Sequence, residues 1–253
     1  MVSPRDAKAK WPRGVRSLRN SLRNSLRSSA RCSVLVFAAW LALAAPAGAQ
    51  ADAGWRLVQE DVQTATRVWL RDRPGAVAAF RASTIIEARL TSLAAVLLDH
   101  RRTAEWVYRA SEAVLLSSDG PTRGVTLVVT AMPFPLRDRE SIVAWEMNQD
   151  PQTLVVTLAG HGLPDGAPPN ARRVRMPIVE SRWQFTPRPD GRVDVLFEGL
   201  GDPGGNLAAP LLRSVVNAAL WEGPWQTVRA MHEIVRRPPF PLAELPFIVE
   251  PAR

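Results

Sequence analysis

The chain has 253 residues, of which 46% are hydrophobic and 22% charged, and its formal net charge is +8. Such a basic excess is typical of proteins that bind nucleic acid, but residues 1–49 hold nine of the 32 basic residues and one of the 24 acidic residues. Residues 50–253 therefore carry 23 residues of each sign, and we expect no nucleic-acid partner.

Residues 1–49 have the pattern of a secretory signal peptide. An arginine-rich region precedes the apolar run 34–45, and the small residues Ala47 and Ala49 come just before Gln50. The apolar run is shorter than the roughly 20 residues that a transmembrane helix needs. We expect secretion across the inner membrane into the periplasm and cleavage before Gln50; a retained N-terminal anchor is the alternative. The single cysteine, Cys32, precedes the apolar run, so the mature chain would have no disulfide.

Residues 50–253 are expected to form one domain. Short strands are predicted at 55–60 and 66–70, followed by a turn at 71–75, and 80–88 predicts a third strand. Apolar residues then recur with helical spacing from Leu90 to Leu98. This helix is expected to end near 99–102, before a short helical turn that carries Glu105 and Trp106.

From Ser111 onward, alternating apolar residues predict antiparallel strands. The alternating sets are Val125/Leu127/Val129, Val143/Trp145/Met147, Leu154/Val156/Leu158, Val179/Ser181/Trp183/Phe185 and Val193/Val195/Phe197. Turns are predicted at 119–121, 148–152, 160–170 and 187–191, and Pro189-Asp190-Gly191 is typical of a hairpin turn.

The segment 201–237 predicts a glycine-rich loop followed by a long amphipathic helix. Gly223-Pro224 interrupts the helical pattern, so we predict a kink or a break near Pro224. Strands followed by one long helix indicate the α+β class. The apolar stripe of the helix consists of Leu212, Val215, Val216, Ala219 and Leu220 before the interruption, and of Val228, Met231, His232 and Val235 after it.

Three sequence patterns of catalytic or cofactor sites are incomplete or absent in this chain. Gly199–Gly204 matches the dinucleotide pattern GxGxxG, but only about 50 residues follow and they lack the second strand of a βαβ unit. His232-Glu233-x-x-Arg236 lacks the second histidine of a zinc site, and no GxSxG elbow is present. We therefore expect no metal, no cofactor and no catalytic residue. Asp138 and Glu140 are expected to form salt bridges at the surface or rim.

Several short sequence segments, in their order along residues 55–237, resemble the START (steroidogenic acute regulatory protein-related lipid transfer) domain family. They are Phe80-Arg81-Ala82, Leu98-Asp99 with Glu105-Trp106, Phe134–Glu140, Trp183-x-Phe185-x-Pro187 with Gly191, and Asp202–Gly205 with Asn217. The resemblance implies a helix-grip fold, in which a curved antiparallel sheet surrounds a long C-terminal helix and encloses an apolar tunnel for one lipid.

The resemblance also implies a ligand-binding set. Some sterol-binding members carry a cavity arginine six residues after the arginine of the Arg-acid pair, and this chain has Trp145 there, which suggests a more apolar tunnel. The residues expected to contact the ligand are Arg139, Trp145, Met147, Trp183, Phe185, Val195, Phe197, Leu212, Val215, Val216, Ala219 and Met231.

The expected function is non-catalytic binding, and transfer, of a lipid or another hydrophobic small molecule by a monomer that contacts a membrane transiently. The helix after the glycine loop would act as a lid, with hinges before Leu207 and at Gly223-Pro224. A cyclase- or aromatase-like enzyme that uses the same cavity is the alternative, with Arg139, Glu146 and His232 as its ionisable groups. A third hypothesis is an envelope interaction protein whose cavity has collapsed.

Overall fold

The computed structural model describes residues 54–73, 79–205 and 210–252. Contacts divide the chain into two units, Met1–Ala47 and Gly48–Arg253, and every described residue belongs to the second unit. The expected signal peptide and the expected hinge before Leu207 lie outside the described residues.

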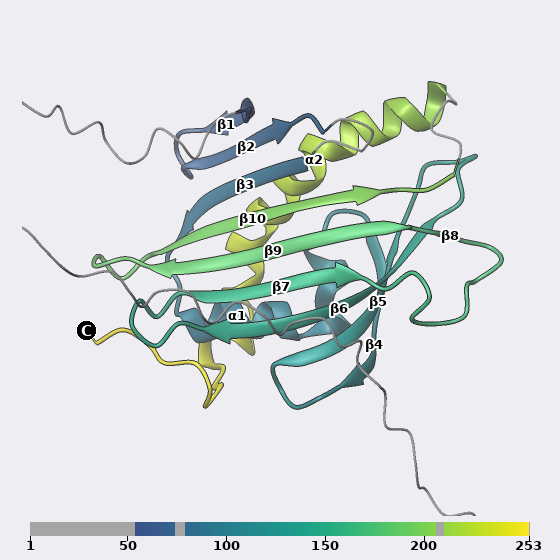
Figure 1. Ribbon diagram of the computed structural model, residues 1–253. Helices are drawn as coiled ribbons and strands as arrows, with labels where there is room; N and C mark the ends of the chain where they lie inside the picture. The colour runs from purple at the N-terminus through teal and green to yellow at the C-terminus, as the bar shows by residue number, and fades with distance from the viewer. Residues whose placement is uncertain (1–53, 74–78, 206–209, 253) are drawn as a thin grey trace, which may run out of the picture. The chain divides into compact units, whose positions relative to one another are not determined.

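The described residues form a large antiparallel sheet, two α-helices and two short 3-10 helices (Figure 1). In chain order the elements are β1 (Arg56–Asp61), β2 (Thr66–Arg71), β3 (Ala79–Ile86), α1 (Leu90–Leu98), η1 (His100–Glu105), β4 (Ala110–Ser118), β5 (Arg123–Thr130), β6 (Arg139–Gln149), β7 (Val156–Gly162), β8 (Val174–Arg175), β9 (Ile178–Pro187), β10 (Val193–Asp202), α2 (Pro210–Ile234) and η2 (Phe240–Leu242). The predicted strands, the first helix and the long last helix are all present.

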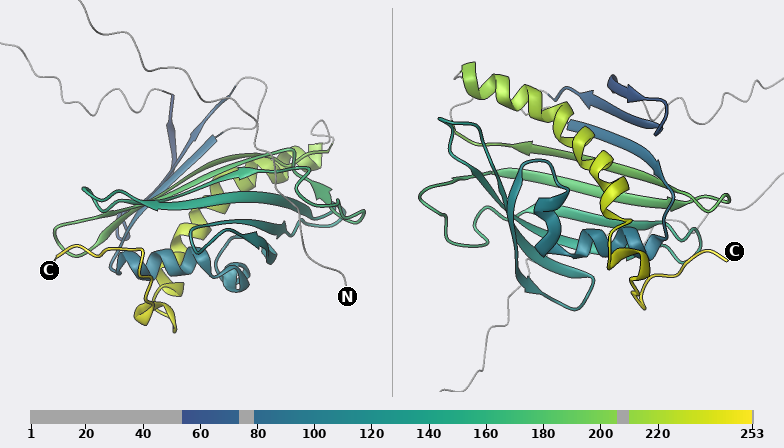
Figure 2. Two further views of the ribbon diagram at one scale, coloured as in Figure 1. Left: turned by 60° about the horizontal axis from the view of Figure 1, so that its bottom comes forward. Right: turned by 180° about the vertical axis from the view of Figure 1, so that it is seen from behind.

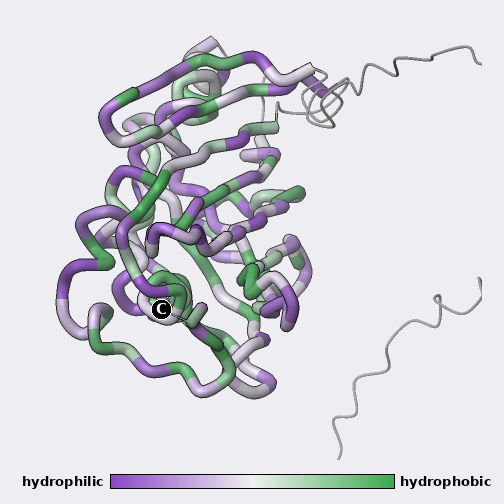
Figure 3. Tube along the Cα trace, turned by 90° about the vertical axis from the view of Figure 1, so that its left-hand side faces the viewer, coloured by the Kyte–Doolittle hydropathy of each residue, from purple (hydrophilic) through white to green (hydrophobic). Residues whose placement is uncertain are grey.

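The strand order along the sheet is β1-β2-β3-β10-β9-β7-β6-β5-β4, and β8 pairs with β6. Neighbours along this path are antiparallel, whereas the short β6–β8 pairing is parallel. The β3–β10 pairing joins segments more than 100 residues apart, with Ala82 opposite Phe197. Hydrophobic and hydrophilic residues alternate along the strands (Figure 3), so the sheet has one apolar face and one polar face.

Both α-helices lie on the same face of the sheet, which we call the inner face (Figure 2, right). Most side chains of α1 are buried, because this helix is enclosed by the sheet and by η2. Helix α2 packs against β2 and β3 through Trp225, Val228 and Met231. No helix in the described ranges has the length and apolarity that crossing a bilayer requires.

Of the kink or break predicted near Pro224, the structure has no break, because α2 continues through Pro224 as one helix. The helix changes direction partway along its length (Figure 2), as an internal proline predicts, since proline removes one backbone donor without disrupting the following turns. Among the side chains of α2 whose burial the structure describes, the buried ones begin at Pro224 and continue with Trp225, Thr227 and Val228. Packing of this second half against the sheet offsets the cost of the proline.

Two other boundaries differ from the sequence prediction. Strand β7 continues to Gly162, so the loop predicted from residue 160 begins at residue 163, three residues later. Leu154 precedes the strand and has a positive φ of 57°. The predicted Pro189-Asp190-Gly191 hairpin is confirmed: Gly191 has φ of +79°, and its N–H donates to the carbonyl of Arg188 at 3.1 Å.

Candidate functional site

A cavity of about 360 Å³ lies on the inner face of the sheet, within the size range of small-molecule sites. Its strand residues follow the two-residue alternation, because the register sets Trp145 opposite Gly160, Leu158 opposite Trp183, and Trp183 opposite Phe197. The side chains from the sheet are Phe80, Thr126, Val128, Thr130, Ser141, Val143, Trp145, Leu158, Val179, Glu180, Ser181, Trp183, Phe197 and Leu200, with Leu97, His100, Thr103, Trp106, Val107 and Thr227 from the covering segments.

Aromatic side chains and α1 close one end of this inner-face cavity. Trp183 stacks on Phe197 with ring centroids 4.0 Å apart, and Trp106 meets Trp183 edge to face at 5.7 Å. His100 lies 5.2 Å from Trp145, whose Nε1 donates to Thr126 Oγ1 at 2.9 Å. This closed end is therefore a mainly aromatic wall with a few polar atoms.

Trp145 can lie flat on the inner face because β5 has a glycine opposite it. A Cβ added to Gly124 would lie 2.6 Å from the Trp145 ring, which is too close for two carbon atoms. The indole thus occupies the space that a side chain at residue 124 would need.

The other end of the cavity is lined by Thr130, Ser141, Met176 and Gly201, near the loop that leads to α2. Arg139 is 4% exposed; its Nε donates to the carbonyl of Pro203 at 3.2 Å, and Nη1 donates to the carbonyl of Arg137. Burial lowers the pKa of Arg139, and neighbouring Arg137 adds to this. Arg139 thus points to the inner side, but it binds the loop at 203–205 and is absent from the cavity wall.

The predicted ligand residues fall into three groups. Trp145, Trp183 and Phe197 line the cavity. Met147, Phe185, Val195 and Met231 belong to the packed core instead, because α1 and the second half of α2 cover their end of the sheet. Val215 and Val216 are half-buried and Ala219 is exposed, and none of the three is on the cavity wall; the side chain of Leu212 lies outside the described part of the chain.

Sequence reasoning missed two sets of lining residues. Thr126, Val128 and Thr130 alternate along β5, and a period-two pattern that admitted threonine would have found them. Leu97, His100, Thr103 and Trp106 come from the end of α1 and from η1. Their contribution depends on how this segment packs across the sheet, which no local pattern reveals.

Glu140 does not form the salt bridge that was expected for it at the surface or rim. It is buried, and Oε1 accepts hydrogen bonds from Arg175 Nη2 at 2.9 Å and from the backbone N–H of Asn170 at 3.0 Å. Arg175 also donates to the carbonyls of Pro164, Ala167 and Pro168. This pair fixes the loop between β7 and β8; Asp138 instead accepts the backbone N–H of Met132 at 2.9 Å.

The two half-buried histidines have different surroundings. His232 Nε2 lies 2.7 Å from Thr84 Oγ1 between α2 and β3, outside the set of cavity residues. Burial lowers the pKa of His232, as do Arg236 and Arg229; burial also lowers the pKa of His100, against the opposing effect of Asp99. Within the described ranges no three His, Cys, Asp or Glu side chains are grouped to hold a metal.

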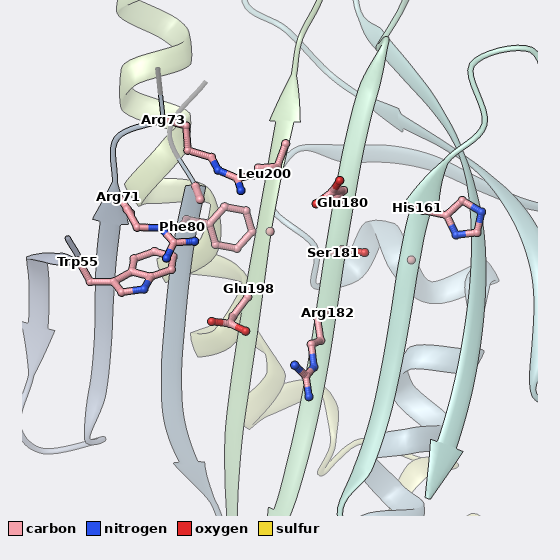
Figure 4. A pocket seen from close by; sticks show the side chains of 13 residues that line it. Trp55, Arg71, Arg73, Phe80, His161, Glu180, Ser181, Arg182, Glu198 and Leu200 are labelled. Atoms are coloured by element: carbon pink, nitrogen blue, oxygen red, sulfur yellow. The ribbon is translucent and has the colours of Figure 1, made fainter. Parts of the chain in front are cut away.

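A second pocket, of about 370 Å³, lies on the outer face of the sheet, away from the helices (Figure 4). Trp55 lies beneath the guanidinium groups of Arg71 and Arg81, each 4.6 Å from its ring centroid. Arg81 also pairs with Glu198 at 2.7 Å. These residues form a polar and ion-paired surface, so the inner-face cavity is the better candidate for a hydrophobic ligand.

Comparisons with known proteins agree with this architecture. No family model matches the sequence. An uncharacterised protein of Pseudomonas aeruginosa is 26% identical over 170 residues, which cover 66% of this chain and 81% of that protein.

Solved structures give a clearer likeness. A STAR-related lipid transfer protein fragment from Xanthomonas axonopodis has a TM-score of 0.64 at 22% identity, covering 73% of this chain and 99% of that one. Human STARD10 has a TM-score of 0.63 at 16% identity, covering 75% and 76% of the two chains. Human StAR-related lipid transfer protein 5 has a TM-score of 0.58 at 16% identity, covering 72% and 88%. With its curved antiparallel sheet and long C-terminal helix, this chain therefore contains a START-like domain of the helix-grip fold.

Proposed function

We propose that the domain binds a lipid or a similar hydrophobic molecule in the inner-face cavity and transfers it between membranes without chemical change. The observation that carries the proposal is the cavity itself, about 360 Å³ in volume and walled by Trp145, Leu158, Trp183 and Phe197. Burying apolar ligand surface against such a wall contributes roughly 25 cal/mol per Å². The lipid transfer proteins that share the fold add support.

The cavity also weighs against the two alternative functions. A collapsed cavity would not leave about 360 Å³ of space. A cyclase would need ionisable groups in the cavity. The three expected ones, Arg139, Glu146 and His232, are all absent from its wall, where the ionisable side chains are His100 and Glu180. Arg139 holds a loop, Glu146 is exposed, and His232 bonds with Thr84. This placement favours binding over catalysis.

Transfer requires contact with a membrane, and we assign this contact to the loop between β5 and β6. Phe134 in this loop is 96% exposed. The loop ends at Arg139, whose side chain donates to the carbonyl of Pro203 in the segment that leads to α2. An exposed aromatic ring can enter the interfacial region of a bilayer. We propose that the protein docks here, after secretion into the periplasm, as a monomer.

The proposal is tested by native mass spectrometry of residues 50–253 purified without detergent. We expect a co-purifying mass in the lipid range, and extraction after incubation should recover that lipid unaltered. Protein that carries no lipid, and takes none up from a mixed lipid panel, would reject the binding proposal; a chemically converted lipid would favour the cyclase.

A matched pair of variants on β5 tests the site. Val128 lines the cavity, whereas Val125 is half-buried on the same strand and outside the cavity wall. Val128→Trp should fill the cavity and abolish the bound mass, while Val125→Trp should retain it. Equal lipid loads in two folded variants, checked by circular dichroism, would place the ligand elsewhere.

A further inference from the structure

The closed end of the inner-face cavity is fixed by packed residues. Trp145 and Trp183 line this end and are 8% and 7% exposed, and the Trp145 Nε1 donates to Thr126 Oγ1 at 2.9 Å. The next residues on the same face of β6 and β9 are Met147 and Phe185, which are 1% exposed and belong to the packed core. A bound chain therefore cannot extend past Trp145 without displacing the core.

The other end of the cavity is bordered by a segment that is also held in place. Gly201 lines the cavity there, and the residues that follow it are tied down by hydrogen bonds. The carbonyl of Pro203 accepts from Arg139 Nε at 3.2 Å, and the N–H of Gly204 donates to Asp202 Oδ1 at 2.8 Å. The space between the two ends is thus set by packed and hydrogen-bonded residues.

The volume of this space limits the size of the ligand. About 360 Å³ is near the lower limit of the roughly 300–1,000 Å³ that small-molecule sites span. A water molecule takes about 30 Å³ of liquid, and a methylene group is similar in size, so the cavity has room for about a dozen such groups. A two-chain membrane lipid exceeds this space, and its second chain would keep its apolar surface in water.

The charge of the lining restricts the polar end of the ligand. The described residues that line the cavity include no Arg or Lys, and their one carboxylate is Glu180, which also lines the outer-face pocket in Figure 4. Burial lowers the pKa of His100 below its ordinary 6.5, so this ring is neutral at neutral pH. An anionic head group would therefore lack a cationic partner on the wall, whereas Thr130 and Ser141 offer hydroxyl groups to an uncharged one.

We infer that the ligand is a lipid with one hydrocarbon chain of about 12 carbons and an uncharged polar end. Its chain points toward Trp145, which sets the chain length, and its polar end lies near Thr130 and Ser141. This inference rests on the proposed binding function and names the ligand class of the same cavity.

Monoacylglycerols of increasing chain length test the class, because they share one uncharged head group. Each displaces the apolar dye N-phenylnaphthylamine from the purified protein. From monooctanoylglycerol to monolauroylglycerol, affinity should rise by about four-fold for each added methylene group that the cavity buries. From monolauroylglycerol to monopalmitoylglycerol, it should rise by less than about four-fold in total. Dilauroylglycerol, which carries a second chain of the same length, should bind no tighter than monolauroylglycerol.

A pair of tryptophan variants tests the residue that sets the chain length. Trp145→Leu opens space at the closed end, so monopalmitoylglycerol should then bind at least about ten-fold tighter than monolauroylglycerol. Trp225 is a buried tryptophan outside the cavity wall, so Trp225→Leu should keep the preference of the unaltered protein. Circular dichroism checks that both variants fold, and the chain-length series on the unaltered protein needs neither of them.

An affinity that keeps rising about four-fold per methylene group up to monopalmitoylglycerol, or tighter binding of dilauroylglycerol, would overturn the single-chain class while the binding function stands. The same chain-length preference in folded Trp145→Leu and Trp225→Leu would overturn the role of Trp145. Failure of the unaltered protein to bind the dye and every probe would reject the binding function, and the inference with it.

Discussion

The N-terminus of α1 is capped from the far end of the chain, and Glu250→Ala tests what this contact contributes. Arg89 occupies the cap position but makes no side-chain cap hydrogen bond. Instead, the Glu250 carboxylate accepts the backbone N–H groups of Leu90 at 3.1 Å and Thr91 at 2.8 Å, and the Thr91 hydroxyl at 2.6 Å. The change matters for function because α1 and η1 form the closed end of the cavity.

The expected loss can be worked from these contacts. Removal of a helix cap costs about 1 kcal/mol, and a negative charge near a helix N-terminus contributes roughly 0.3–1 kcal/mol. The 3.6 Å ion pair with Arg89 adds little, because the Glu250 side chain is 30% exposed and water screens the pair. We therefore expect Glu250→Ala to lower the free energy of unfolding by about 2 kcal/mol, or roughly 4–8 °C in Tm for a domain of this size.

Urea unfolding followed by circular dichroism measures the effect. Glu244→Ala is the matched control, because Glu244 is exposed in the same C-terminal segment and makes no hydrogen bond or ion pair within the described ranges. Glu250→Gln should give an intermediate loss, since one amide oxygen still accepts from Thr91 but the charge is gone. Equal stability of the Glu250→Ala and Glu244→Ala proteins would refute the capping argument.

Two further predictions concern transfer and pH. Phe134→Asp should slow the movement of a fluorescent lipid between vesicles by roughly ten-fold or more, since it removes from the membrane contact the about 1.5–3 kcal/mol that burial of the ring in the bilayer contributes. Leu242→Asp changes another exposed apolar residue, in η2, and should not slow this movement. Equal slowing by the two changes would contradict the assignment of the β5–β6 loop as the membrane contact. Burial lowers the pKa of His100 and His232 below their ordinary 6.5, so the unfolded chain binds more protons just below that pH. The free energy of unfolding should therefore fall as the pH drops through 6.5 and stay level above this pH. His232→Gln, which keeps a hydrogen bond to Thr84, should make this fall smaller when stability is measured by urea titration at several pH values. An unchanged dependence of stability on pH in this variant would contradict the prediction.

Local patterns determined much of the fold. The two-residue alternation in Val143/Trp145/Met147 predicted a strand with one apolar face, because successive side chains of a strand point to opposite sides. The Pro189-Asp190-Gly191 turn was also predictable from the local sequence, because glycine adopts a positive φ without steric cost. The resemblance to START domains then supplied the arrangement of these elements, which the fold confirms.

The site itself depended on tertiary packing. Trp145 and Met147 have the same alternation on β6, yet Trp145 lines the cavity and Met147 lies in the core. What separates them is where α1 and α2 cross the sheet, and no alternation encodes that crossing. The N-terminal signal, by contrast, stays a prediction from the sequence.

Polar contacts between distant segments also came from the tertiary structure alone. Glu140 pairs with Arg175 instead of its arginine neighbours, Glu250 caps a helix 160 residues away, and the buried Nε1 of Trp106 has no hydrogen-bond partner among the described residues. Sequence reasoning can identify side chains that are able to donate or accept hydrogen bonds. Whether each finds a partner depends on which segments fold against it, because burial removes water as the alternative partner.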